Sequence, residues 1–317
     1  MSSFSFERQV AIAAVRKAAE YCQKVTLKAK TIKSDSSPVT IADFASQAII
    51  NHEISKAFPN DFIVGEEDSS LLKSDHSLMS SLLQLLDGFS KEQICSLIDR
   101  GNHCGGAVDR FWTLDPIDGT KGFLRGGQYA ICLGLIENGV PQVSVMATPN
   151  LPFPDLQSKT LGTLFVAVRG HGAFQSCLFD NGKESSIQAG SNENFSRWTE
   201  SFEPAHSAQN KSALILSRLG ITAPSIRMDS QAKYGLIARG EAHVYLRIPT
   251  RPDYEENIWD HAIGSLLVTE AGGVVGDLDG NSLDFTRGRT LGKLSGIAAV
   301  NSRYTFDKVV GIHQQET

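Results

Sequence analysis

The chain has 317 residues, of which 41% are hydrophobic and 21% are charged, and its formal net charge is -5. This composition is typical of a folded protein and excludes an intrinsically disordered one. The negative net charge argues against a general surface for nucleic acid or anionic membranes. We find no signal-peptide-like N-terminus and no run of 18 or more apolar residues, so we expect neither secretion nor a spanning helix.

The cysteines are five in number, widely spaced, and include no C-x-x-C pair. An odd set of isolated cysteines predicts reduced thiols, with neither a disulfide framework nor a zinc site. We therefore expect a cytoplasmic protein, with the nucleus as a second possible compartment.

The first elements of the chain are predicted to be two helices and a strand. Apolar residues recur at helical spacing over residues 6 to 29. A second helix is predicted to begin near Thr40, whose hydroxyl can cap it while Asp43 follows three residues later, and to end at Pro59. The apolar residues 62 to 65 then predict a short strand.

Residues 69 to 110 are rich in serine and less periodic, and we interpret them as a partly helical, mobile insertion. Two hairpins follow a strand that ends near residue 115. The first joins residues 129 to 136 to residues 143 to 148 through an Asn-Gly turn, and the second spans residues 164 to 176.

From about residue 175 the apolar segments alternate between helical and strand-like patterns. This alternation predicts an α/β second half after an α+β first half. We expect an N-terminal α+β domain over residues 1–175, with the insertion inside it, and a C-terminal α/β domain over residues 176–317. The boundary is predicted to lie between about 150 and 190.

Five carboxylates stand out by their positions relative to the predicted elements. Each has an ordinary structural explanation when taken alone. A carboxylate in the first turn of a helix can be exposed, one after a strand can lie in a solvated loop, and one at the head of a helix can be an N-cap. The five are Asp43, Glu66, Asp115, Asp118 and Asp260.

The stretch DPIDGT at 115 to 120 is harder to explain as a turn that happens to be acidic. Pro116 restricts the conformation of Asp115, so two carboxylates are held in a stiff corner with no basic residue beside them. Their repulsion raises the pKa of both groups unless a cation intervenes. Mg²⁺ prefers carboxylate and carbonyl oxygens, and the Ile117 carbonyl lies between the two acids.

Gly119 and Thr120 complete this stretch as one half of a metal-phosphate site. Gly119 allows the backbone to approach a ligand, and Thr120 can meet a phosphate oxygen if a helix begins there. Haloacid dehalogenase-type phosphatases use a different run, Asp-x-Asp-x-Thr after their first strand. Here two residues separate the acids and the stretch lies far into the chain, so that alternative is rejected.

Four motifs, in order, give the sequence a family resemblance. It resembles the lithium-sensitive, Mg²⁺-dependent phosphatases of the inositol monophosphatase superfamily, and within them the 3'(2'),5'-bisphosphate nucleotidases. The resemblance implies a layered α-β-α-β-α sandwich of the inositol monophosphatase and fructose-1,6-bisphosphatase type. The motifs are PVTIAD (38 to 43), IVGEED (63 to 68), WTLDPIDGTKGF (112 to 123) and WDHAIGSLLVTEAGG (259 to 273).

The resemblance also implies roles for the acidic residues. Glu66, Asp115 and the Ile117 carbonyl would bind one Mg²⁺, and Asp118 and Asp260 would join Asp115 in binding a second. A third ion near Glu66 and Asp43 is also implied. Asp43 and Thr120 would then form a proton relay, while the metals activate water and neutralise the leaving oxygen.

A further set of residues is implied to bind the nucleotide. Ser230 and Lys233 would lie one helical turn apart and face one phosphate, and Arg247 would supply a forked contact to it. Asp229 and Tyr234 would be neighbours of the pocket. The complete implied set for substrate binding is Gly119, Thr120, His206, Ser230, Lys233, Arg247 and Asp260.

The expected activity is hydrolysis of the 3'-phosphate of adenosine 3',5'-bisphosphate to AMP. By resemblance, 3'-phosphoadenylyl sulfate is a second substrate, which implies links to sulfate assimilation and salt tolerance, and Li⁺ is an inhibitor. We expect a monomer that acts on this small molecule and has neither a nucleic acid polymer nor a membrane as partner. Two alternatives stay open: an inositol phosphatase, and a catalytically silent nucleotide-binding protein.

Overall fold

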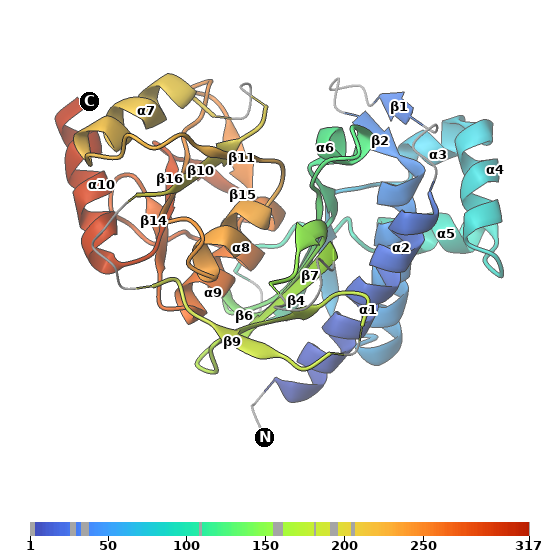
Figure 1. The fold of residues 1–317 in the computed structure, drawn as a ribbon. Helices are drawn as coiled ribbons and strands as arrows, with labels where there is room; N and C mark the ends of the chain where they lie inside the picture. The colour runs from blue at the N-terminus through green and yellow to red at the C-terminus, as the bar shows by residue number, and fades with distance from the viewer. Residues whose placement is uncertain are drawn as a thin grey trace.

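The structure is a computed structural model that describes residues 4–25, 30–32, 38–107, 110–154, 161–180, 182–190, 196–203 and 207–316. Within these ranges, helices and sheets alternate in five layers (Figure 1). A pair of helices covers a large sheet, a second pair separates that sheet from a smaller one, and a third pair covers the smaller sheet (Figure 1). The predicted layered α-β-α-β-α architecture is confirmed.

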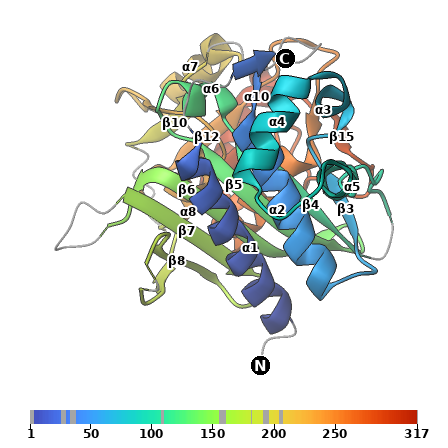
Figure 2. The same cartoon turned by 90° about the vertical axis from the view of Figure 1, so that its right-hand side faces the viewer.

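The first two layers come from the N-terminal half. Two helices lie across one face of a seven-stranded sheet (Figure 2). The sheet has the order β3-β4-β5-β6-β7-β8-β9, with β3 parallel to β4 and every other pair antiparallel. The bounds are α1 Ser5–Lys24, α2 Ile41–Ala57, β3 Phe62–Gly65, β4 Arg110–Asp118, β5 Ala130–Glu137, β6 Val140–Pro152, β7 Leu161–Val168, β8 Ala173–Cys177 and β9 Ser185–Ile187.

Local sequence signals explain where several of these elements begin and turn. Thr40 caps α2 in a reciprocal capping box with Asp43, as predicted. Asn138 and Gly139 both have positive φ, at 52° and 73°, which a two-residue turn between antiparallel strands requires. Both predicted hairpins are present, as β5-β6 and β7-β8.

The remaining three layers come from the C-terminal half. Helices α8 and α9 share one apolar core with both sheets, α9 against β6 and β7 and α8 against β12. The second sheet has the order β11-β10-β12-β16-β14, and α7 and α10 cover its outer face. The bounds are β10 Trp198–Ser201, α7 Gln209–Arg218, β11 Ile226–Met228, α8 Ala232–Ala238, β12 Val244–Arg247, α9 Ala262–Glu270, β14 Val274–Asp277, β16 Ile297–Val300 and α10 Arg303–Glu316.

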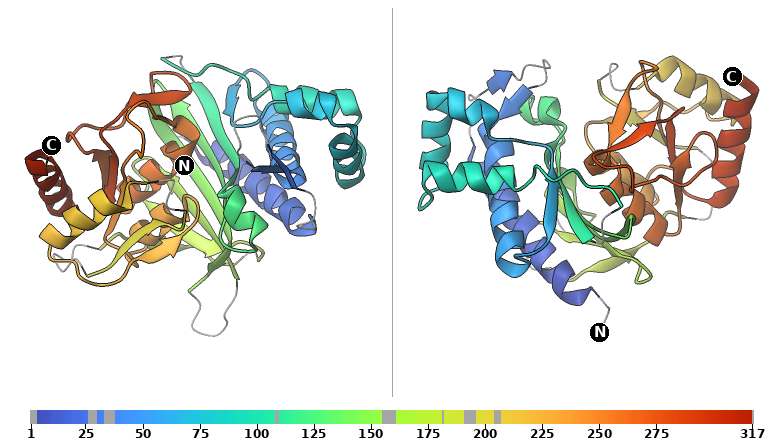
Figure 3. Two further views of the ribbon diagram at one scale, coloured as in Figure 1. Left: turned by 90° about the horizontal axis from the view of Figure 1, so that it is seen from above. Right: turned by 180° about the vertical axis from the view of Figure 1, so that it is seen from behind.

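The serine-rich segment after β3 is more regular than its composition indicates. Three helices pack with α2 around leucine and isoleucine side chains. Asp75 and Ser90 cap two of them, so part of the polar content serves helix starts. Seen from behind, these helices lie at the opposite side of the molecule from α10 (Figure 3). Their bounds are α3 Ser70–Ser74, α4 His76–Leu85 and α5 Lys91–Asp99.

The short elements complete the chain. Two of them, α6 and the 3₁₀ turn η2, lie next to the predicted acidic residues. Their bounds are β1 Lys30–Ile32, β2 Pro38–Thr40, α6 Thr120–Leu124, β13 Glu255–Asn257, η2 Ile258–Asp260 and β15 Thr290–Lys293. Among the described residues, no helix has both the length and the apolar character needed to cross a bilayer.

The two predicted halves are joined through a common core. The predicted boundary between residues 175 and 176 falls inside β8, and the chain passes from the first sheet to the second between Ile187 and Trp198. Because α9 packs against the first sheet, residues around position 260 are brought close to the end of β4.

Candidate active site

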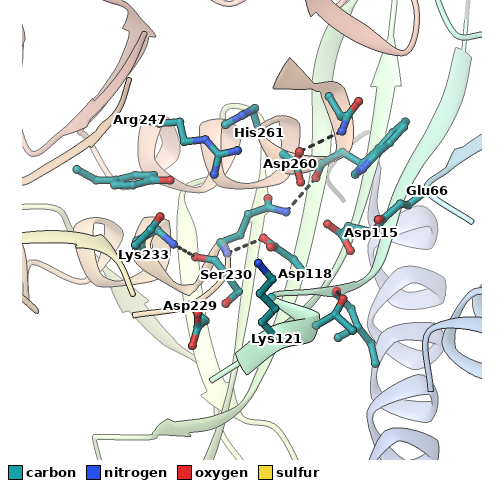
Figure 4. A pocket seen from close by; sticks show the side chains of 18 of the residues that line it. Glu66, Asp115, Asp118, Lys121, Asp229, Ser230, Lys233, Arg247, Asp260 and His261 are labelled. Atoms are coloured by element: carbon teal, nitrogen blue, oxygen red, sulfur yellow. Dashed lines mark hydrogen bonds between the residues drawn. The ribbon is translucent and has the colours of Figure 1, made fainter. Parts of the chain in front are cut away.

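A cavity of about 510 Å³ lies where segments of the two halves meet (Figure 4). Its size is within the range of small-molecule sites. Four carboxylates, Glu66, Asp115, Asp118 and Asp260, gather on one side of it, and Lys233 and Arg247 lie on the other, with Lys121 near Asp118 (Figure 4). The predicted residues that line it are Glu66, Asp115, Ile117, Asp118, Gly119, Thr120, Ser230, Lys233, Arg247 and Asp260.

A β-bulge turns both acids of the DPIDGT stretch toward the cavity. Asp115 is paired with Cys132 on β5, and Asp118 with Ala130, so three steps along β4 match two along its partner. The extra residue cancels the usual alternation of side chains between the two faces of a sheet. Ser46 from α2 donates to the Pro116 carbonyl at 2.8 Å and so fixes the bulge from behind.

Asp115, Asp118 and Asp260 bring their carboxylate oxygens within 4.8 Å of one another. Burial raises the pKa of Asp115, and the charges of Glu66, Asp118 and Asp260 raise it further. The pKa of Asp260 is raised chiefly by burial and by Asp118, against the opposing effect of Arg247. The pKa increase that the sequence predicts from clustered carboxylates is thus present at Asp115, and burial is its largest cause.

Asp260 does not cap α9, although its position at the head of the helix would permit it. It ends the turn η2, and no side-chain capping bond is made at the start of α9. Its Oδ2 lies 3.4 Å from Nδ2 of Asn257. Gln231 links Asp118 to the turn that carries Asp260. Its backbone amide donates to Asp118 Oδ2 at 2.6 Å, and its side-chain amide donates to the Trp259 carbonyl at 2.9 Å (Figure 4).

Asp43 and Thr120 lie side by side behind the acidic cluster. Asp43 is 1% exposed, and its Oδ2 accepts from the amide and hydroxyl of Thr40. Its Oδ1 lies 3.4 Å from the Thr120 hydroxyl, which is also 3.2 Å from the Ile117 carbonyl. The hydroxyl is thus placed to donate to Asp43 and to accept from a water molecule on the cavity side.

Glu66 follows β3 in a loop that α2 holds in place. Gln47 of α2 accepts from the Glu67 amide and donates to the Glu67 carbonyl, at 3.0 and 2.5 Å. Glu66 itself is half-buried and faces the cavity, while the next residue, Glu67, is buried. The loop is therefore built into the structure and is not a freely solvated turn.

The acidic cluster fits divalent cations by its donor set. Asp115 Oδ1 is buried and has no hydrogen-bond partner among the described residues. Leaving such a group unpaired costs about 1–3 kcal/mol or more when it is charged. Carboxylate oxygens and a peptide carbonyl are the ligands that Mg²⁺ prefers, and a cation among them would remove both the unpaired atom and the mutual repulsion.

The basic side of the cavity differs in detail from the prediction. Ser230 is not one helical turn from Lys233 within a helix, because it precedes α8 and has a positive φ of 71°. Lys233 lies in the first turn of α8 and donates to the carbonyls of Ser230 and Met228, at 2.7 and 3.2 Å. Burial lowers the pKa of Lys233 to about 8.

The start of α6 packs so closely against the segment before α8 that a glycine is required there. Gly119 has a positive φ of 84°, and a Cβ on it would lie 3.1 Å from the Ser230 side chain. The absent side chain lets the start of α6 approach the segment before α8.

Arg247 directs its fork at a carboxylate of its own chain. Its Nε and Nη2 atoms donate to Glu256 at 2.9 and 3.0 Å. His261 lies 3.0 Å from the same carboxylate through Nε2 and 2.7 Å from the Tyr234 hydroxyl through Nδ1. Burial raises the pKa of Glu256, but Arg247 and His261 outweigh it and lower the value to about 2. Arg247 lines the cavity with this fork paired to Glu256, and its expected contact to a phosphate stays a prediction.

One predicted site residue is not among the described residues, and several residues that line the cavity were not predicted. His206 is not among the described residues, so its predicted role stays a prediction. Asp229 lines the cavity, whereas Tyr234 is buried behind it. Lys121 lines the cavity but was not predicted to do so, although it follows Thr120 directly. Other lining residues that were not predicted, with no comparable signal, are Ser201, Gln231, Tyr245, Arg251, Tyr254, Asn257, Trp259 and His261.

Comparison with known proteins adds a family to this geometry. The family model described as "Inositol monophosphatase family" matches residues 3–315. A 3'(2'),5'-bisphosphate nucleotidase of Schizosaccharomyces pombe is 47% identical, over 97% of this chain and 95% of the relative. A 3'(2'),5'-bisphosphate nucleotidase of Emericella nidulans is 42% identical, over 94% of both chains.

Solved structures support the fold alone, because their sequence identity is low. An inositol monophosphatase from Anabaena has a TM-score of 0.64 at 20% identity, with 99% of this chain and 97% of that chain covered. An IMPase of Thermotoga maritima has a TM-score of 0.64 at 21% identity, with 99% and 98% covered.

Proposed function

The chain belongs to the inositol monophosphatase family, and on this premise we propose that it is a metal-dependent 3'(2'),5'-bisphosphate nucleotidase. It hydrolyses the 3'-phosphate of adenosine 3',5'-bisphosphate to give AMP and phosphate. The same reaction converts 3'-phosphoadenylyl sulfate to adenylyl sulfate. The names of the relatives that are 47% and 42% identical support this choice of substrate.

The observation that carries the proposal is the buried Asp115 oxygen without a partner, in a cavity that Asp118, Asp260 and Glu66 also line. Asp115 and Asp118 reach the cavity only because β4 is bulged, and Asp260 comes from a segment more than 140 residues away. This arrangement destabilises the folded chain, because it raises the pKa of buried carboxyls and leaves one buried oxygen without a hydrogen bond. It therefore has no structural explanation. A site for Mg²⁺ explains both features.

The proposed roles follow from the contacts of each residue. Glu66, Asp115, Asp118, Asp260 and the Ile117 carbonyl hold two or three Mg²⁺ ions. When bound, these ions supply Lewis acids that activate water and neutralise the charge of the leaving oxygen.

Thr120 and Asp43 move the proton of the attacking water. The Thr120 hydroxyl accepts from that water and donates to Asp43 Oδ1, 3.4 Å away. Asp43 is held for this task by Thr40, which occupies its other oxygen.

The basic side of the cavity supports a substrate with a second phosphate. Lys121, Lys233 and Arg251 line the cavity together with Arg247. The charge of Arg247 is largely balanced by Glu256, and Lys121 lies 4.0 Å from Glu203, so Lys233 and Arg251 are the lining cations without an ion pair to a carboxylate among the described residues. Ser230 lies between Lys233 and Asp118 (Figure 4), and Gly119 packs against Ser230, so both are in reach of a ligand that spans the cavity.

A comparison of substrates at equal concentration tests this proposal. We expect adenosine 3',5'-bisphosphate to be hydrolysed with a kcat/KM at least about tenfold above that of adenosine 3'-monophosphate. The reason is that the missing 5'-phosphate leaves the basic residues without a charge-assisted partner, worth about 1.5 kcal/mol or more. Phosphate release in Mg²⁺ is the measurement, and inositol 1,4-bisphosphate is the third substrate.

The outcomes separate the proposed function from its rivals. Equal rates with and without the 5'-phosphate would contradict the nucleotide assignment. A preference for inositol 1,4-bisphosphate would identify an inositol phosphatase. Binding of adenosine 3',5'-bisphosphate without release of phosphate would identify a catalytically silent protein.

A further inference from the structure

We propose that Arg289 is a positioning residue that joins the loop carrying Glu66 to the turn carrying Asp260, and so assembles the metal site across the two halves of the molecule. This inference rests on the proposed metal-binding role of these two carboxylates. Arg289 precedes β15 in the C-terminal half and is half-buried. It does not line the cavity, so its contribution acts through other residues.

The guanidinium of Arg289 binds the N-terminal half through backbone carbonyls. Its Nη2 donates to the carbonyl of Gly65 at 2.5 Å, the residue directly before Glu66. Its Nη1 donates to the carbonyls of Gly101 and His103, at 3.1 and 3.0 Å. The guanidinium therefore binds both the end of β3 and residues 101 to 103, which pair with β3 through a bridge between Val64 and Asn102.

The same residue holds the turn η2 in the C-terminal half. Its carbonyl accepts from the amide of Ile258 at 3.0 Å, which is the first residue of η2. Its guanidinium lies over the ring of Trp259, 4.8 Å from the centroid. Asp260 is the next residue, so Arg289 contacts both residues that precede this carboxylate in the turn.

The two sets of contacts link the residue before Glu66 and the two residues before Asp260 through one residue, Arg289. On its other side, the Glu66 loop is held by Gln47, and a Cβ on Gly65 would lie 2.8 Å from the Gln47 side chain. Gly65 is thus confined between Gln47 and Arg289. Among the described residues, the hydrogen bonds of Arg289 go to carbonyls and none goes to a carboxylate, so its charge is used to hold backbone.

Arginine suits this task better than lysine. A guanidinium presents five donors in a fixed plane, which can bind three carbonyls and stack on an indole at the same time. An ammonium on a flexible stem keeps the charge but cannot hold three acceptors in that fixed geometry. Groups that orient metal ligands from behind affect metal affinity by about 10-fold to 100-fold when they are replaced.

Titration of the metal-free protein with Mn²⁺, followed by the electron paramagnetic resonance signal of free Mn²⁺, tests the proposal without relying on turnover. We expect Arg289→Met to weaken the affinity by about tenfold or more, and Arg289→Lys to weaken it by a smaller factor. The matched control is Arg110→Met. Arg110 also joins distant segments, through Asp61 and Glu7, but none of its partners is in the acidic cluster.

Each outcome decides between positioning and general stability. Weakened Mn²⁺ binding in both Arg289 variants, with the control within about twofold of the wild type, supports the proposal. Unchanged binding in the Arg289 variants overturns it, and so does equal weakening in all three. If Arg289→Met does not fold, Arg289→Lys carries the test. A wild type that binds Mn²⁺ but releases no phosphate from adenosine 3',5'-bisphosphate contradicts the proposed function alone, because the titration still reports on Arg289.

Discussion

Two buried carboxylates at the site have opposite surroundings: Asp115 lines the cavity, and Glu256 lies against Arg247 and His261, which also line it. Asp115 is 2% exposed and Glu256 is 1% exposed, so water screens neither of them. Glu256 accepts from Arg247 and His261, and its pKa falls to about 2 in spite of burial. Asp115 is surrounded by further carboxylates, and both burial and those charges raise its pKa.

The contrast separates two uses of a buried charge. A buried carboxylate whose oxygens are matched by donors of the same chain holds the structure together, and its partners explain its presence. One whose neighbours are also acidic, and whose oxygen has no partner, destabilises the chain that carries it. Glu256 therefore belongs to the framework of the site, and the group around Asp115 fits the cation site proposed above.

Replacing one acid of the unmatched group gives the largest expected effect, and it falls on catalysis. We expect Asp118→Asn to lower kcat by more than about a thousandfold, or roughly 4 kcal/mol, because one metal ligand loses its charge. The fold should persist, since an asparagine oxygen can still accept from the Gln231 amide.

Phosphate release and circular dichroism measure the two sides of this prediction. The matched control is Asp284→Asn, an exposed residue paired with Arg287. Retained activity in Asp118→Asn would show that the unmatched acids serve no catalytic metal and would remove the contrast.

Replacing the matched carboxylate should instead affect stability. Glu256→Gln leaves Arg247 buried beside a neutral amide, and removal of one partner from a buried ion pair costs about 3 kcal/mol. Urea unfolding of the metal-free protein measures this change. Asp284→Asn again serves as the control, with an expected loss below about 1 kcal/mol, because its ion pair is exposed. A loss for Glu256→Gln no larger than that of the control would mean that the two groups do not differ in the way described.

The layers and the acidic residues that line the cavity could be predicted from sequence because each depended on a local pattern. The capping of α2 by Thr40 and the turn at Asn138 are set by a few neighbouring residues. The DPIDGT motif could be recognised as a candidate site because a proline, a glycine and two carboxylates within six residues have few structural explanations. The orientation of its two carboxylates, by contrast, depends on a bulge against β5 that no local sequence pattern predicts.

The parts that the sequence did not reveal are contacts across long distances. Arg289 reaches the carbonyl of a residue 224 positions earlier, and acceptors on the backbone carry no sequence signal. The pairing of Arg247 with Glu256 was missed for a different reason. The resemblance gave Arg247 a phosphate as partner, a role that stays a prediction, and gave no signal for the buried carboxylate nine residues away.

The smallest expected effect tests the contrast most directly, because its sign should change with metal. In chelator, we expect Asp115→Asn to raise the free energy of unfolding at pH 7 by about 1 kcal/mol, since it removes one buried charge from a repelling group. A carboxyl whose pKa is raised on folding contributes stability below its unfolded value, near 3.8, and that contribution is lost as pH rises through the folded value. The wild type should therefore lose stability relative to Asp115→Asn as pH rises above about 4.

Saturating Mg²⁺ should reverse the order. Binding stabilises the wild type by about 2.7 kcal/mol when the ion is present at 100 times its dissociation constant, and the variant, which lacks a ligand, gains less. Thermal unfolding at pH 7 with chelator and with Mg²⁺ gives all four values. A variant that is less stable than the wild type in chelator would mean that Asp115 is matched by its own chain after all. It would then belong with Glu256, and the case for a cation at this position would rest on the catalytic result alone.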